Sequence, residues 1–281
     1  MIIKGTKAAS PRSHIITSNT SPSQPSENNH TMAQPAHSEA CCTIPPVSAD
    51  YTEKGKFIEI DGLKTYATGP EDASIVIILI YDVFGFGPQI LQGADLLAHP
   101  SKHPYRVLIP DFLAGNLANP AWFPPDTPEK RTAMGTYFGP QGPGNAATML
   151  ASLMGVVKAI KTADTVNTLG VVGYCWGAKI VSLSCAAGTP FAAGVELHPS
   201  GLDTADAPNI TVPLCMLASE DEDADAVKAF GEALTVPKLV ERFEGAPHGW
   251  MTSRGDLSDV KGKADYERGY ATVMTFFHEH L

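Results

Sequence analysis

The stretch Leu169–Val181 reads LGVVGYCWGAKIV and places Cys175 at the centre of a Gly-x-Cys-x-Gly motif. An apolar run precedes the motif, and a segment with helical periodicity follows it. This order is typical of a nucleophile elbow, a strained turn that exposes its central side chain at the start of a helix. The alternative for a free cysteine is burial as a small apolar residue, which is our interpretation of Cys185 and Cys215.

Apolar runs and helical segments alternate along the chain on both sides of this elbow. The pattern predicts strands over 56–62, 63–69, 75–82, 105–111, 169–175, 191–199, 212–219 and 238–245. It predicts helices over 88–98, 145–161, 176–187, 223–234 and 264–280. Continuous apolar runs such as IVIILIYD are typical of strands buried in a parallel sheet. The alternation therefore predicts an α/β fold, a mostly parallel sheet with helices on both faces.

Residues 112–145 interrupt this alternation with a stretch rich in proline, glycine and aromatic residues. The stretch is longer than a simple connection between two elements. Two interpretations stay open, a variable surface loop and a lid over a pocket.

The first 46 residues differ in composition from the rest and predict a disordered N-terminal tail, followed by one domain over 47–281. Basic residues without acids near the N-terminus weakly resemble a mitochondrial transit peptide, but prolines interrupt the amphipathic helix that such a peptide needs. Met32 is an alternative start. We expect a solvated tail and a cytoplasmic protein, with a mitochondrial location as the alternative.

Charge and cysteine content limit the partners of the chain. Its 281 residues carry a formal net charge of -10 and no basic run, so neither nucleic acid nor a membrane surface is an expected partner. The longest apolar run, Ile75–Tyr81, is far shorter than the roughly 20 residues that span a bilayer. Five cysteines without C-x-x-C spacing predict no disulfide framework and no metal site. A homodimer stays open.

A nucleophile needs a base and a group that orients the base, and in elbow hydrolases these follow as acid and then histidine. The strand over 212–219 ends in five carboxylates, and His248 follows the next strand. We expect Asp221 to be the acid, because in this fold the acid lies a few residues beyond the end of its strand. Asp223 is expected to cap the next helix. The five carboxylates are Glu220, Asp221, Glu222, Asp223 and Asp225.

Five further stretches, CCTIPP, YDVFGF, IPDFLAG, GYCWGAK and APHGWMTSRGD, extend the pattern from about residue 41 to the end of the chain. Together they resemble the dienelactone hydrolase family, in particular its fungal-type members. The resemblance implies an α/β-hydrolase fold without a separate cap domain. It also implies a Cys-Asp-His triad of Cys175, Asp221 and His248, with Asp82 as the acidic residue beside the resting thiol.

The chain departs from the bacterial members of this family at two positions. Those members carry substrate-binding arginines where Gly115 and Thr252 stand here. Because neither arginine is matched here, we expect an ester or lactone other than dienelactone itself as the natural substrate. Arg254 is close enough in sequence to supply a replacement cation.

These residues predict a hydrolase that uses no metal and no organic cofactor. Cys175 would attack an ester carbonyl, and the backbone N–H groups of Trp176 and Val83 would bind the oxyanion. His248 would protonate the leaving oxygen and then activate water against the thioester, while Asp221 orients its ring. The expected substrate contacts are Arg254, Trp250, His198 and Trp122, although His198 is equally consistent with packing in the core.

Two readings from other classes stay open. Cys175 could serve a redox or electrophile-sensing protein instead of turning over substrate. The same fold could also carry a non-catalytic binding protein. The sequence favours the small-molecule ester or lactone hydrolase, because nucleophile, acid and histidine occur in the order that the elbow enzymes use.

Overall fold

The structure is a computed structural model that describes residues 50–98, 104–162 and 165–281. The predicted tail, with Met32 and the transit-like stretch, lies outside the described residues.

The described residues build an eight-stranded sheet in the order β1-β2-β4-β3-β5-β6-β7-β8. The strands β1 and β2 pair in antiparallel fashion, β2 runs antiparallel to β4, and all the other neighbouring pairs are parallel. The predicted α/β-hydrolase fold is therefore confirmed, with no separate cap domain in the described part of the chain. The strands are β1 Lys56–Ile60, β2 Leu63–Thr68, β3 Ile75–Ile80, β4 Arg106–Pro110, β5 Thr168–Tyr174, β6 Ala193–Leu197, β7 Leu214–Ala218 and β8 Lys238–Arg242.

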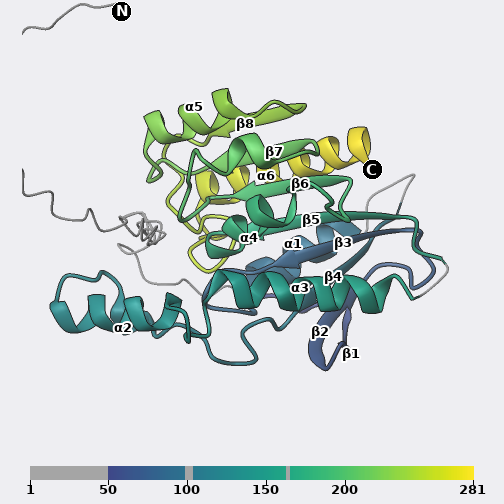
Figure 1. Ribbon diagram of the computed structural model, residues 1–281, viewed down its shortest axis with the longest axis horizontal. Helices are drawn as coiled ribbons and strands as arrows, with labels where there is room; N and C mark the ends of the chain where they lie inside the picture. Colours follow the sequence, from purple (N-terminus) through teal and green to yellow (C-terminus); the bar gives the residue numbers. More distant parts are fainter. Residues whose placement is uncertain (1–49, 99–103, 163–164) are drawn as a thin grey trace, which may run out of the picture. The chain divides into compact units, whose positions relative to one another are not determined.

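Helices cover both faces of this sheet (Figure 1). One face carries α3 and α4, the other carries α1 and α6, and α5 packs along β8. The C-terminal helix begins four residues earlier than the sequence predicts, because Asp259 caps it by accepting from the Gly262 amide. The helices are α1 Pro88–Ala98, α2 Pro128–Phe138, α3 Ala146–Ile160, α4 Trp176–Ser184, α5 Ala224–Ala233 and α6 Val260–His280.

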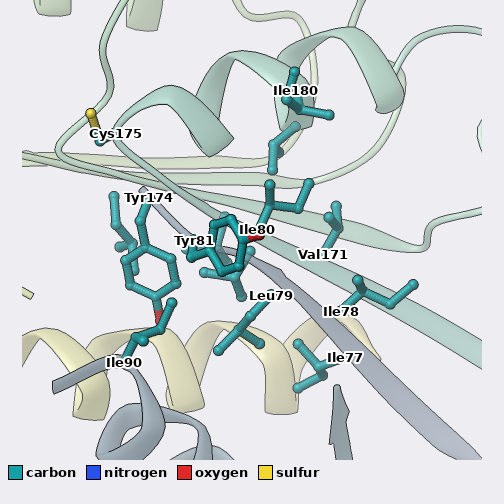
Figure 2. Packing of buried hydrophobic residues seen from close by; sticks show 14 of the residues in the cluster. Ile77, Ile78, Leu79, Ile80, Tyr81, Ile90, Val171, Tyr174, Cys175 and Ile180 are labelled. Carbon is teal, nitrogen blue, oxygen red and sulfur yellow. The ribbon is translucent and has the colours of Figure 1, made fainter. Parts of the chain in front are cut away.

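The core lies where the central strands meet the helices. All six residues of β3 are apolar and the last five are buried, as expected for a strand covered on both faces. Figure 2 shows Ile180 of α4 above these strands and Ile90 of α1 below them. Cys175 directly follows β5 at the edge of this core and is itself only 4% exposed.

The long stretch over 112–145 contains the α-helix α2 and a short 3-10 helix, Pro120–Trp122, neither of which the sequence predicted. Thr127 caps α2 by accepting from the Lys130 amide at 3.3 Å, and Pro128 occupies its first turn. The helix buries only Met134, Tyr137 and Phe138. Because most of α2 is polar, it has no apolar stripe that would reveal its period in the sequence.

Among the described residues, no helix is both long enough and apolar enough to cross a bilayer.

Candidate active site

The predicted elbow is present between β5 and α4. Cys175 has a φ of 54° and a ψ of -112°, a conformation that residues with a side chain rarely adopt. A Cβ on Gly173 would lie 2.2 Å from the Gly177 carbonyl oxygen, and one on Gly177 would lie 2.2 Å from the Ile80 carbonyl oxygen. Strand and helix can therefore approach this closely only because both flanking residues are glycines.

The carboxylate that contacts the His248 ring belongs to Glu222. The prediction that Asp221 would contact this ring is wrong. His248 Nδ1 lies 2.6 Å from Glu222 Oε1, and both side chains are 2% exposed. Asp221 is exposed, and its Oδ2 accepts from the backbone amide of His248 at 2.7 Å. The turn after β7 directs the longer Glu222 side chain inward, where its second oxygen accepts from the Ser219 amide.

Asp223 confirms the other prediction made for this acidic cluster. It caps α5, and its side chain accepts from the Ala226 amide at 2.8 Å. Three of the five carboxylates therefore have distinct contacts: Asp223 caps a helix, Asp221 accepts from a backbone amide and Glu222 contacts the His248 ring.

The charge state of His248 follows from its two neighbours. Burial by itself lowers the pKa of His248, but the sulfur of Cys175 and then the carboxylate of Glu222 raise this pKa to about 10. At neutral pH the imidazole is therefore protonated, as it would be in an ion pair with a thiolate.

Asp82 lies beside the thiol at the end of β3, in the position that the sequence resemblance implies. Its carboxylate accepts from the Ser253 hydroxyl at 2.7 Å and from the Phe84 amide at 2.8 Å. Burial, and then the negative charge of Cys175, raise the pKa of Asp82. Ser253 could not be identified as its partner from the sequence, since the two residues are 171 positions apart.

A small cavity of about 10 Å³ adjoins Cys175 and His248. Such a volume holds roughly one water molecule. Arg254 lines this cavity; it is 4% exposed and donates from Nη1 to the His248 carbonyl oxygen at 3.3 Å. The cavity is lined by Asp82, Phe84, Cys175, His248, Gly249, Ser253 and Arg254.

The other residues predicted to contact substrate are not among those that line this cavity. The Trp250 ring stacks on Phe243 with centroids 4.4 Å apart, and the Trp122 ring contacts Tyr137 at 5.7 Å. Neither tryptophan lines the small cavity. The ring of His198 packs against that of His248, with centroids 5.1 Å apart.

The two backbone amides predicted to bind the oxyanion belong to Trp176 and Val83. Trp176 is the first residue of α4, so its N–H has no carbonyl partner one turn earlier in the helix. Its indole N–H donates to the Gly144 carbonyl oxygen at 2.9 Å, which fixes the start of the helix. Val83 follows β3, the strand next to β5, and its carbonyl oxygen accepts from the Ala118 amide at 3.0 Å.

The described residues include no group of three or more histidine, cysteine, aspartate or glutamate side chains that could hold a metal ion. The chemistry open to the site is that of a buried thiol, an imidazole and two carboxylates.

Known proteins are similar to this chain over most of its length. The model of the dienelactone hydrolase family matches residues 63–281. An uncharacterized AIM2 family protein of Schizosaccharomyces pombe is 36% identical, over 85% of this chain and 98% of its own length. The human carboxymethylenebutenolidase homolog is 24% identical, over 83% of this chain and 94% of its own length. The solved structure of a dienelactone hydrolase from Anabaena variabilis has a TM-score of 0.55 at 14% identity, covering 82% of this chain and 98% of that one.

Proposed function

Because the chain belongs to the dienelactone hydrolase family and is a carboxylic ester hydrolase, we propose that it cleaves activated esters or lactones through a thioester on Cys175. His248 acts as the acid and base, and Glu222 orients its ring. One observation carries the proposal: a buried imidazole lies between an elbow cysteine and a carboxylate.

In the resting site the proton of the thiol lies on His248. The resulting thiolate is a stronger nucleophile than a neutral thiol, and the position at the start of α4 favours its negative charge. Glu222 balances the imidazolium on its far side through the 2.6 Å contact at Nδ1. The site therefore has its nucleophile ionised before the ester arrives.

In the first half-reaction, Cys175 Sγ forms a bond to the ester carbonyl carbon, and the carbonyl oxygen takes up negative charge. The amides of Trp176 and Val83 are the proposed donors to this oxyanion. When the intermediate collapses, the bond between the carbonyl carbon and the leaving oxygen breaks, and His248 gives its Nε2 proton to that oxygen. The acyl group remains on sulfur as a thioester.

In the second half-reaction, neutral His248 takes a proton from water as the water oxygen attacks the thioester carbonyl carbon. The carbon–sulfur bond then breaks, the acid product leaves, and the thiolate–imidazolium pair is restored. Glu222 keeps the same ring nitrogen facing the sulfur in both halves, which is the orienting role of the acid in triads of this kind.

An ester needs more room than the small cavity provides, so substrate entry requires movement in its wall. Phe84 in that wall contacts Phe123 of the 112–145 stretch, with ring centroids 5.4 Å apart. This contact favours the interpretation of residues 112–145 as a lid and not as a variable surface loop. Arg254, already at the cavity, is the cation that a substrate carboxylate would meet once the wall opens.

The proposal is tested by trapping the acyl-enzyme. After rapid mixing with phenyl acetate and acid quench, mass spectrometry should find one acetyl group on the peptide that contains Cys175, and the adduct should disappear as phenol release ends. Cys175→Ala should show neither the adduct nor turnover. Cys185→Ala, which changes a buried cysteine outside the site, should retain both. Turnover by Cys175→Ala would refute the mechanism, and a permanent adduct without turnover would favour the electrophile-sensing alternative.

A further inference from the structure

We propose that His198 is a positioning residue for ester hydrolysis, which holds the His248 ring with its side chain and the Cys175 backbone with its turn. The inference rests on the roles proposed above for Cys175 and His248. His198 follows β6 directly, and its side chain is fully buried.

The ring of His248 is held by two groups, Glu222 at Nδ1 and the sulfur of Cys175. Hydrogen bonds to ring nitrogens lie near the ring plane, so they leave the imidazole able to tilt about the line that joins them. The His198 ring meets it at an interplanar angle of 70° with centroids 5.1 Å apart, an edge-to-face arrangement that is favourable for aromatic rings. Tyr174 backs His198 at 6.0 Å. The contact with the His198 ring therefore restrains this tilt and keeps Nε2 toward the sulfur.

His198 supports this arrangement without competing for the proton. Burial, and then the positive charge of His248, lower its pKa well below the usual value, so the ring stays neutral. Neither ring nitrogen has a hydrogen-bond partner on another described residue. Its contribution therefore comes from the face and edge of the ring. The titratable and charged groups around the His248 side chain are Asp82, Cys175, His198, Glu222 and Arg254, and Asp221 accepts from its backbone amide.

The backbone on both sides of His198 forms hydrogen bonds with Cys175 in the elbow. The Cys175 amide donates to the Leu197 carbonyl oxygen at 3.0 Å, and the Cys175 carbonyl oxygen accepts from the Ser200 amide at 3.0 Å. Between these two contacts, His198 has a φ of 37°. Conformations of this kind persist only where the surroundings hold them, so the strained turn and the strained elbow stabilise each other.

Two substitutions distinguish the role of the His198 ring from the role of its backbone conformation. Asparagine tolerates a positive φ but removes the ring, whereas phenylalanine keeps a flat ring and removes both nitrogens. We expect His198→Asn to lower kcat about 10²-fold with KM within about threefold, the cost of misplacing a reacting group by roughly 1 Å. His198→Phe should recover most of that loss. His280→Asn, at the end of α6 and away from the site, is the matched control.

A direct readout of the ion pair accompanies the kinetics. The thiolate absorbance near 240 nm, taken as a difference from Cys175→Ala, should appear about one pH unit higher in His198→Asn, because a displaced imidazolium stabilises the thiolate less. Circular dichroism checks the fold, and if asparagine unfolds the chain, His198→Leu replaces it in the comparison with phenylalanine.

The outcomes separate this inference from the proposed function. Wild-type kcat and an unshifted thiolate absorbance in a folded variant without the ring would overturn the role of His198, even where Cys175→Ala is inactive. An equal loss in the phenylalanine variant would also overturn it. Activity in Cys175→Ala would instead overturn the thioester mechanism.

Discussion

Replacing Glu222 with glutamine should slow hydrolysis far more than replacing its neighbour Asp221 with asparagine. The two oxygens of Glu222 serve different donors, His248 Nδ1 and the Ser219 amide. A glutamine must turn its carbonyl oxygen toward one of them and its NH₂ group toward the other. With the oxygen on the backbone amide, the NH₂ group meets Nδ1 and forces the proton of a neutral ring onto Nε2, the tautomer that cannot accept a proton from water.

The magnitude follows from the burial of the pair. Both side chains are 2% exposed, and removing one partner of a buried charge pair costs about 3–5 kcal/mol. Glutamine keeps the shape of the side chain, so the lower part of that range applies, and about 3–4 kcal/mol corresponds to roughly 10²- to 10³-fold in kcat. In Asp221→Asn the amide oxygen can still accept from the His248 backbone amide. The expected loss is therefore about 1 kcal/mol, which corresponds to a roughly fivefold lower kcat.

The assay is phenol release from phenyl acetate at fixed pH, with acylation and deacylation separated by single-turnover mixing. Deacylation should suffer at least as much as acylation in Glu222→Gln, because only deacylation needs the ring as a base toward water. Circular dichroism confirms that both variants fold. If Asp221→Asn is the slower enzyme, the geometry around His248 has been assigned to the wrong carboxylate and the triad proposed above is refuted.

Two further predictions concern a buried acid and the leaving group. Burial raises the pKa of Glu196 from 4.5 to about 8, so its contribution to stability is present below pH 4.5 and is lost as the pH rises toward 8. In urea titrations, the free energy of unfolding of Glu196→Gln minus that of the wild type should therefore be larger at pH 8 than at pH 5. The same difference for the exposed Glu279→Gln should not change with pH. Equal differences at the two pH values for Glu196→Gln would contradict this prediction. A tetrahedral intermediate on sulfur expels a phenoxide more readily than an ethoxide, so kcat/KM should be much higher for the phenyl than for the ethyl ester of one acid. Comparable values would show that the leaving group does not limit the reaction.

The sheet and the elbow were predictable because their signals are local. Buried parallel strands appear as continuous apolar runs, and the glycines at 173 and 177 mark a place where two backbones approach closely. The cap at Asp223 is a signal of the same kind, since its side chain bonds an amide three residues later.

The ring partner of His248 was not predictable in the same way. Glu222 and Asp221 are adjacent in a turn, where side-chain directions follow no period, and only the path of the backbone decides which one is buried. Asp82 and Ser253 likewise meet only after β3 and the loop beyond β8 have been brought to one edge of the sheet. Such contacts depend on tertiary structure, so a reading of short segments does not identify them.

The site depends on the parallel pairing of the sheet, because its groups come from five different strand ends. Adjacent parallel strands deliver their carboxyl ends to one edge, and the register that sets Gly173 opposite both Ile80 and Glu196 aligns the loops that follow. A shift of one residue in β5 would turn the Cys175 side chain to the other face of the sheet. The reacting geometry is thus fixed by the apolar strands beneath it, which explains why a strained elbow can persist at the edge of a rigid core. The groups are Asp82 after β3, Cys175 after β5, His198 after β6, Glu222 after β7 and His248 after β8.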